Sequence, residues 1–423
     1  MLTAIAGINW GDEGKGRMVD LLSENYDIVV RYQGGNNAGH TVINERGKFI
    51  LNLLPSGILR ENTVNVLGPG MVIDLEHLYN EVEKLKSAGI AITRENLKIS
   101  DKAVICMPYH KLLDNLEEDR LGEAKFGSTR RGIAPVYADK YMKKAFRMAD
   151  LIYFDTLKKK VPSVVEWKNL TVEGGYRAKP IDADEMILWL EKYGLPFSDY
   201  ITDTTRYLDN AVNEGKSVMF EAQLGALRDI DFGIYPYTSS SSTLASYAPI
   251  GAGIPSRKLD NVIGIMKAYS SCVGEGPFVS ELFDREGDAL REAGGEYGAA
   301  TGRPRRVGGF DMPASKYGVV LQGANEIALT KLDVLSYLEK IPVCVAYDID
   351  GKISDQFPTG EALFRAKPVY EYLDGWNCSV SSCRSFEELP QKAKEYILFI
   401  KEKVGCNIKY VSVGAGRNEY FVM

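Results

Sequence analysis

Residues 3–16 have the sequence TAIAGINWGDEGKG, and this stretch decides the fold class. The apolar run Thr3 to Ile8 predicts a β-strand, and the glycine-rich segment Asn9 to Gly16 predicts a loop that leaves it. A strand, a loop and a helix in this order indicate an α/β fold. The helix is predicted from apolar side chains that recur at helical spacing, namely Met18, Val19, Leu21 and Leu22.

The same transition from strand to polar loop occurs a second time. Ile28 to Tyr32 predicts a strand, and residues 33–41, QGGNNAGHT, follow it. Such loops gather at the carboxyl ends of the strands in an α/β sheet. Because no Pro/Ser-rich linker or repeat divides residues 1–423, we expect one α/β domain with a large, mostly parallel central sheet, flanking helices and long active-site loops. The other predicted elements are strands at Asn65–Leu67, Val218–Glu221, Leu259–Ala268, Ile327–Leu329, Val343–Tyr347 and Lys409–Val413 and a helix at Leu75–Ala88.

The composition limits the class of protein. Of the 423 residues, 45% are hydrophobic and 26% charged, which is typical of a globular protein with a large core. The net charge of -6 argues against nucleic-acid binding, which requires a positive surface. Six cysteines without a C-x-x-C pair and three histidines argue against disulfides and structural zinc. The first apolar run is too short for a signal peptide and no run is long enough to span a membrane, so we expect a cytoplasmic protein.

The first loop invites comparison with a Walker A motif. A strand, a glycine-rich turn with Lys15 and a helix can cradle phosphate through backbone N–H groups and the helix N-terminus. The strict pattern is not met, because Gly16 stands where Ser or Thr should follow the lysine and Asn9 stands where a glycine should lead. The alternative is a plain glycine turn with an exposed lysine. Asp12 favours a functional loop, because an acid beside phosphate would be repulsive unless it held Mg²⁺ or acted as a base.

The second loop places one histidine, His40, among small residues. A single histidine is commonly a satisfied structural side chain, and that alternative applies here. Its position between Gly39 and Thr41, next to a predicted strand, is better suited to proton transfer. We therefore expect Asp12 and His40 to form an acid/base pair at adjacent strand ends.

Two further segments carry recognition chemistry. Arg303, Arg305 and Arg306 present guanidinium groups suited to carboxylates and to phosphate, although a charged surface loop is the alternative. Lys331 and Asp333 follow a predicted strand in the order Lys-x-Asp, which is typical of guanine readers in GTPases but also occurs by chance. A carboxylate can accept hydrogen bonds from N1 and N2 of guanine, which adenine does not offer.

These motifs resemble those of the adenylosuccinate synthetase family. Residues 10–16, WGDEGKG, and 33–41, QGGNNAGHT, are similar to its two signature segments. The resemblance spans nearly the whole chain, in the family's order. It continues through Leu54-Pro55-Ser56-Gly57-Ile58-Leu59, Arg131-Gly132-Ile133, Asp229-Ile230-Asp231, Tyr235-Pro236-Tyr237, Thr301-Gly302-Arg303-Pro304-Arg305-Arg306 and Thr330-Lys331-Leu332-Asp333-Val334-Leu335.

The resemblance implies a P-loop-like, GTP-dependent ligase that joins L-aspartate to IMP and yields adenylosuccinate, GDP and phosphate. Asp12 would take the N1 proton of IMP, so that O6 attacks the γ-phosphate of GTP and forms 6-phosphoryl-IMP. His40 would stabilise and protonate the groups around O6, and the amine of aspartate would then displace phosphate. Mg²⁺, held by Asp12 and the Gly39 carbonyl, would neutralise developing charge. A homodimer is implied too, with Lys143 reaching the partner's site.

The resemblance also implies three sets of binding residues. The expected IMP site comprises Asp12, Glu13, Gly14, Lys15, Asn37, Ala38, Gly39, His40, Thr129, Lys143, Gln223, Leu224, Ser239 and Arg303. The expected aspartate site comprises Ala299, Ala300, Thr301, Gly302, Arg303, Pro304 and Arg305. The expected GTP site comprises Gly11, Asp12, Glu13, Gly14, Lys15, Gly16, Arg17, Gly39, His40, Thr41, Arg305, Lys331, Leu332, Asp333, Ser412, Val413 and Gly414.

Several positions depart from the family pattern. The family's Glu-Gly-Ala-Gln-Gly corresponds to residues 221–225, EAQLG, so the IMP-contacting glutamine is displaced by one position. Lys143 and Cys272 stand where the family has arginine, Arg130 where it has glycine, Arg17 where it has lysine, and Ala300 where it has threonine.

These departures leave alternatives open. One is a paralogue that acts on (d)GMP to give 2-aminoadenylosuccinate, although retention of Asp12 favours IMP. Another is a non-catalytic GTP-binding regulator, which would have no use for His40 or the arginine loop. A binding-only paralogue with a remodelled pocket is the third. A dinucleotide oxidoreductase is disfavoured, because no G-x-G-x-x-G follows the first strand.

Overall fold

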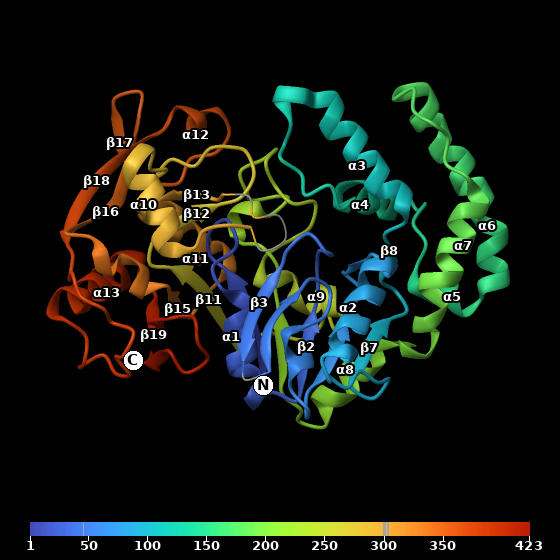
Figure 1. The fold of residues 1–423 in the computed structure, drawn as a ribbon, viewed down its shortest axis with the longest axis horizontal. Coiled ribbons are helices and arrows are strands. Elements are labelled where there is room, and N and C mark those ends of the chain that lie inside the picture. Colours follow the sequence, from blue (N-terminus) through green and yellow to red (C-terminus); the bar gives the residue numbers. More distant parts are fainter. Residues whose placement is uncertain (45, 299–301, 303) are drawn as a thin grey trace.

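The computed structural model describes residues 1–44, 46–298, 302 and 304–423. Its centre is a ten-stranded sheet in the order β20-β19-β15-β11-β1-β10-β2-β5-β7-β9 (Figure 1). Every neighbouring pair is parallel except β19 with β20. The predicted α/β class and mostly parallel sheet are therefore confirmed. The strands are β1 Leu2–Gly7, β2 Ile28–Arg31, β5 Val64–Leu67, β7 Leu97–Ser100, β9 Ile201–Thr202, β10 Val218–Glu221, β11 Asn261–Lys267, β15 Glu326–Thr330, β19 Asn407–Ser412 and β20 Tyr420–Val422.

Helices cover both faces of this sheet because side chains alternate along each strand. In β1, Ile5 faces helix α1 (Lys15–Leu22) and packs with Met18 and Val19. Ala4 and Ala6 belong to the core on the other face, with α8 and α9. The remaining helices are α2 Leu75–Ser87, α3 Pro108–Leu121, α4 Ile133–Tyr141, α5 Met148–Ile152, α6 Phe154–Asn169, α7 Ala183–Gly194, α8 Thr204–Asn213, α9 Ala248–Ala252, α10 Asp284–Gly294, α11 Met312–Gln322, α12 Glu361–Arg365 and α13 Gln391–Val404.

Smaller sheets and a helical hairpin flank the centre. The predicted strand at Val343–Tyr347 lies within β16, in a separate sheet with β14, β17 and β18. Figure 1 shows this sheet at one end of the molecule and the hairpin of α6 and α7 at the other. The remaining strands are β3 His40–Asn44, β4 Gly47–Leu51, β6 Val72–Ile73, β8 Val104–Ile105, β12 Ser270–Cys272, β13 Arg306–Gly308, β14 Phe310–Asp311, β16 Lys340–Ile349, β17 Lys352–Ser354 and β18 Lys367–Asp374.

The topology brings distant segments to one edge of the sheet. Strands β1, β2, β10, β11, β15 and β19 run parallel, so all their carboxyl ends open at the same edge. The loops at 8–14, 32–39 and 222–225 leave three neighbouring strands there, and Lys331 follows β15. This edge is where ligands bind in open α/β sheets, and it is the place to look for a site.

Candidate active site

The carboxylate of Glu13 bonds to the backbone of its own loop and to Lys15. Glu13 is buried, and its carboxylate accepts hydrogen bonds from the backbone N–H groups of Asn9 at 3.1 Å and Gly11 at 2.8 Å. It also pairs with the ammonium group of Lys15, at 2.6 Å. Lys15 is therefore buried rather than projecting from the turn as a Walker A comparison suggests. Two N–H groups that a Walker A loop would offer to phosphate are taken by this carboxylate.

The first turn of α1 remains suited to an anion. Its N-cap, Gly14, has φ of 96° and supplies no side-chain cap, and the turn carries no acidic residue. The positive end of the helix dipole is thus open to negative charge. Thr330, at the end of β15, donates to the Glu13 carbonyl at 2.7 Å and fixes the loop against the sheet.

Asp12 lies where the first loop meets the arginine-rich segment. Its φ of 59° is uncommon for a residue with a side chain and turns the carboxylate out of the loop. The side chain is 31% exposed, and its Oδ2 lies 3.0 Å from Nε of Arg305. The predicted base therefore faces the predicted aspartate-binding arginine.

His40 is held by a buried carboxylate that the sequence analysis did not single out. The Nδ1 atom of His40 bonds to Glu221, at the carboxyl end of β10. Glu221 also accepts from the backbone N–H and the hydroxyl of Ser56, both at 2.8 Å, and lies 3.8 Å from Nη1 of Arg31. Nε2 of His40 is buried without a hydrogen-bond partner. One ring nitrogen is thus committed to the protein, and the other is available for a ligand.

Burial and the local charges set the protonation of this group. Burial lowers the pKa of His40, and the nearby Arg31 guanidinium lowers it further. Burial alone would raise the pKa of Glu221, but contact with His40 and Arg31 and the hydrogen bond from Ser56 lower it. We therefore assign an ionised Glu221 and a neutral imidazole whose Nδ1–H donates to it. The bare Nε2 can accept a proton or a hydrogen bond.

His40 sits directly on the first turn of α1. A Cβ atom added to Gly16 would lie 2.5 Å from Cβ of His40, so only glycine permits this approach. The absence of Ser or Thr at position 16, which breaks the Walker A pattern, therefore has a steric reason. The two predicted catalytic residues flank the same helix N-terminus, one on each loop.

Two side-chain hydrogen bonds shape the second loop. Asn52 donates to the carbonyl of Ala38 at 2.9 Å and is itself in contact with His77 at 3.1 Å. Asn37 accepts from the N–H of Gly35 at 3.1 Å, which closes a tight turn within the loop. These bonds hold the predicted IMP-binding residues in a defined conformation.

The displaced glutamine points into this loop. Gln223 is fully buried and donates to the carbonyl of Gly35 at 2.8 Å and of Gln33 at 3.2 Å. Its Oε1 has no partner. Leu224, with φ of 59°, packs closely beneath Gly11 of the first loop. Gln223 therefore supports the loop, and its free oxygen is the atom that remains for a ligand.

The predicted guanine-side residues come together around Arg17. Arg17 bonds to the hydroxyl of Ser412 and donates to the carbonyls of Gly416 at 2.6 Å and Glu419 at 3.1 Å. Burial raises the pKa of Asp333, whose Oδ1 is buried without a partner. Leu332 and Val413 are core residues that fix the two segments, and Gly414 packs against Glu419.

The arginine-rich segment is described in part. Ala299, Ala300, Thr301 and Arg303 lie outside the described residues. Gly302 and Pro304 are exposed. Arg305 is anchored: its Nη1 lies 2.8 Å from Glu296, a buried carboxylate that also pairs with Lys267 and Lys331. Arg306 turns the other way and pairs with Glu281.

Three predicted IMP-site residues come from other segments of the chain. Thr129 is exposed in the loop between α3 and α4. Lys143 is exposed just beyond α4, with φ of 62°. Ser239 is half-buried, and its hydroxyl lies 3.4 Å from that of Ser241.

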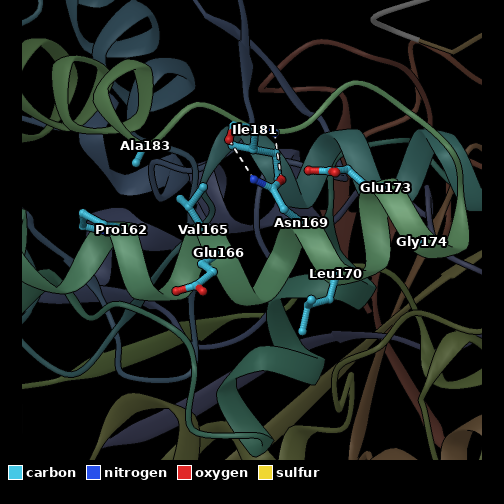
Figure 2. A pocket seen from close by; sticks show the side chains of 9 residues that line it. All are labelled: Pro162, Val165, Glu166, Asn169, Leu170, Glu173, Gly174, Ile181 and Ala183. Atoms are coloured by element: carbon cyan, nitrogen blue, oxygen red, sulfur yellow. Dashed lines mark hydrogen bonds between the residues drawn. The ribbon is translucent and has the colours of Figure 1, made fainter.

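A hollow far from these groups in the sequence lies on the helical hairpin. A groove of about 770 Å³ lies along the α6–α7 hairpin, and Figure 2 shows its lining. Asn169 bridges it with two hydrogen bonds to the backbone of Ile181, at 2.8 and 2.9 Å. Its only charged lining residues, Glu166 and Glu173, are acidic, so it does not suit a nucleotide.

Among the helices of the described residues, none combines the length and the apolar character that crossing a membrane requires.

Four buried charged residues were missed by sequence reasoning: Arg31, Glu221, Lys267 and Glu296. Arg31 and Glu221 end strands of otherwise apolar residues and pair in register across β2 and β10. A charge that closes an apolar strand is a usable signal, because a buried charge needs a partner.

Comparison with known proteins agrees with this geometry. A sequence model of the family described as adenylosuccinate synthetase matches residues 4–421. The adenylosuccinate synthetase of Caldanaerobacter subterraneus subsp. tengcongensis is 44% identical over 423 residues, covering 100% of this chain and 99% of that protein. That of Halothermothrix orenii is 44% identical over 416 residues, covering 98% and 97%.

Solved structures extend the comparison to the fold. The fully ligated adenylosuccinate synthetase of Plasmodium falciparum superposes with a TM-score of 0.93 at 37% identity, covering 100% of this chain and 99% of that one. The succinoaminodeoxyadenylate synthetase of cyanophage S-2L, bound to dGMP and dATP, gives a TM-score of 0.62 at 18% identity, covering 100% and 95%, and shares the fold. The chain therefore belongs to the adenylosuccinate synthetase family.

Proposed function

We infer that the protein joins L-aspartate to IMP at the expense of GTP and releases adenylosuccinate, GDP and phosphate. This is the committed step from IMP towards AMP. The observation that carries the inference is the full-length family match. The geometry supports it, because Asp12 precedes the N-terminus of α1 and His40 packs against its first turn. A regulator that only bound GTP would need neither side chain at that position.

The chemistry requires activation of a purine oxygen. Asp12 takes the N1 proton of IMP, and O6 attacks the γ-phosphorus of GTP. The O6–P bond forms while the P–O bond to the β-phosphate breaks, and GDP leaves. The amine of aspartate then attacks C6, the C6–O bond breaks, and phosphate departs. Phosphorylation is needed because an unmodified purine oxygen is a poor leaving group.

His40 acts on O6 of IMP and on the phosphoryl group that O6 receives. Its Nε2 is the free ring nitrogen, and the ionised Glu221 on Nδ1 stabilises an imidazolium when Nε2 takes up a proton. A protonated Nε2 can donate to O6 or to the phosphoryl group and spread the developing charge. Glu221 acts through His40 and is a positioning residue.

The residues present fit Mg²⁺. This ion prefers oxygen ligands and is commonly held by one or two carboxylates together with substrate phosphates. Asp12 offers a partly exposed carboxylate beside the helix N-terminus where phosphate would lie. We assign Asp12 and the Gly39 carbonyl as its protein ligands. Bound there, the ion would neutralise charge on the phosphates.

Specificity for guanine is expected to depend on Asp333. Its unpartnered carboxylate oxygen can accept from N1 and N2 of the base. We expect Asp333→Asn to lower kcat/KM for GTP roughly 10- to 150-fold, the loss of one charge-assisted hydrogen bond. XTP, which carries an oxygen at C2, should gain relative to GTP, because the amide can donate to that oxygen. An unchanged ratio of the two kcat/KM values would contradict this assignment.

A substrate panel tests the function itself. Phosphate release is measured with GTP and Mg²⁺ while IMP, GMP or dGMP and L-aspartate are added singly and in pairs. We expect release only when IMP and aspartate are both present. Release with dGMP in place of IMP would favour the paralogue, and GTP binding with no release in any mixture would favour a regulator.

We further propose a homodimer in which Lys143 completes the partner's IMP site. Exposed apolar side chains at Tyr141 and Met142, 80% and 55% accessible, adjoin Lys143 and suit an interface. Lys143→Ala and Asp12→Ala homodimers should each be nearly inactive. Mixing them with subunit exchange should restore about a quarter of the wild-type sites, because half the dimers then carry one intact site of two. If mass spectrometry shows that the subunits have exchanged and activity still does not recover, Lys143 does not complete the partner's site.

We treat residues 1–423 as one domain, because Arg17 near the start of the chain donates to Gly416 and Glu419 near its end. We place the enzyme in the cytoplasm. Its six cysteines are free thiols, which suits a reducing compartment.

A further inference from the structure

A buried carboxylate, Glu296, lies between the proposed guanine and aspartate sites. It is 0% exposed and follows α10. Its Oε1 accepts from Lys267 at 2.7 Å, from Lys331 at 2.9 Å and from the hydroxyl of Tyr269. Its Oε2 accepts from Arg305 at 2.8 Å. An ionised carboxylate has about four acceptor positions, so these four donors use its capacity fully.

Each donor comes from a different part of the site. Lys267 ends β11, and Lys331 follows β15 two residues before Asp333. Arg305 belongs to the arginine-rich segment, and its Nε lies 3.0 Å from Oδ2 of Asp12. A single carboxylate therefore links the guanine side to the proposed base through one guanidinium.

The backbone reinforces the same link. The N–H of Arg305 donates to the carbonyl of Glu296 at 2.9 Å, and Lys331 also donates to the carbonyl of Gly294 at 2.6 Å. Arg291, on α10, donates to the carbonyl of Arg305 at 2.9 Å. Residues 294–296 thus hold the base of the arginine-rich segment and the Lys331 side chain at one point.

The charges make the arrangement interdependent. Burial would raise the pKa of Glu296, but Lys267, Lys331 and Arg305 outweigh it and lower that pKa. Burial lowers the pKa of Lys267 to about 8, against the influence of Glu296. Because three cations share one anion, a displacement of the Lys331 or the Arg305 side chain changes the electrostatic potential at the other side chain.

We propose that Glu296 is the positioning residue that couples guanine-nucleotide binding to L-aspartate binding. A guanine base that orders Lys331 and Asp333 fixes Glu296, and Glu296 then holds Arg305 ready for a carboxylate of aspartate. The coupling is reciprocal, because each ligand must change the affinity of the other by the same factor. The proposal rests on the proposed function for the identity of the two ligands.

The test is equilibrium binding of GDP, with IMP and Mg²⁺ present, in the absence and presence of saturating L-aspartate. GDP cannot phosphorylate IMP, so nothing turns over. In the wild-type protein we expect aspartate to tighten GDP binding by a factor within roughly 5 to 150. In Glu296→Gln the factor should fall to near unity. Glu281→Gln is the matched control, because Glu281 pairs with Arg306 of the same segment and does not contact Lys331; its factor should match the wild type.

Other outcomes would overturn the proposal. A wild-type factor of one would do so, as would a folded Glu296→Gln protein that keeps the wild-type factor. If Glu296→Gln does not fold, Tyr269→Phe replaces it, since this change removes one donor and leaves every charge in place. The factor should then fall part of the way, and an unchanged factor contradicts the coupling. Wild-type turnover without coupling would refute this inference and leave the ligase function standing.

Discussion

Replacing Asp12 by Asn should lower kcat by about 10²- to 10⁴-fold, the usual contribution of a positioned general base. The amide matches the carboxylate in shape but cannot take the N1 proton of IMP. Binding of GDP and IMP should weaken far less than kcat, because Asn keeps a side-chain oxygen at this position and the turn closed by Glu13 and Lys15 does not depend on Asp12. Rapid-quench measurement of phosphoryl transfer isolates the affected step.

The matched control is Asp155→Asn. Asp155 is an exposed carboxylate on α6, 91% accessible, and pairs only with Lys158 among the described residues. It should retain wild-type kcat. An Asp12→Asn enzyme with more than a tenth of wild-type kcat would remove Asp12 from the role of base.

Replacing Glu221 by Gln should change both the rate and its pH dependence. Donation from Nε2 requires the imidazolium, so kcat falls as pH rises through the pKa of His40. The groups facing His40 are Glu221 on β10, Arg31 on β2 and Lys15 on α1. Without the Glu221 charge the two cations act unopposed and lower the pKa of His40. The descending limb of kcat therefore moves to lower pH, and kcat at neutral pH falls by about 10²-fold or more.

A second buried acid provides the control for this prediction. Glu81 also faces Arg31, and it accepts N–H groups from Asn52 and Leu53 without touching His40. Glu81→Gln should leave the descending limb in place. Thermal unfolding confirms that both variants fold. If the descending limb of the pH profile of kcat stays in place in Glu221→Gln, Glu221 only stabilises the core. The same conclusion follows if the limb moves equally in both variants.

The sequence predicted the layout of the site better than its bonding. Strand ends at Ile28–Tyr32 and Val218–Glu221 could be placed because apolar runs stop at glycine-rich loops. The pairing of Arg31 with Glu221 could not, because it depends on β2 and β10 becoming neighbours although these two residues are 190 positions apart in the sequence. Local periodicity does not say which strands become neighbours in the sheet.

The first loop shows a second limit of sequence reasoning. A lysine in a glycine-rich turn predicts an exposed cation, yet Lys15 is 3% exposed and paired with Glu13. The spacing of two residues allowed this pair, but its burial depends on Gly7 and Gly225 leaving room for both side chains. The same holds for Glu296, whose four donors come from segments up to 35 residues away, between Lys267 and Lys331.

The position of β1 has a consequence for synthesis on the ribosome. Strand β1 lies between β10 and β11 in the sheet, so its two neighbours are translated only after residue 217 and residue 260. The guanine-side residues at 412–414 are translated after both of these strands. Nascent chains consequently hold an exposed apolar strand for most of translation, which is the condition that recruits chaperones. Fragments released before residue 412 would lack the guanine-side residues 412–414.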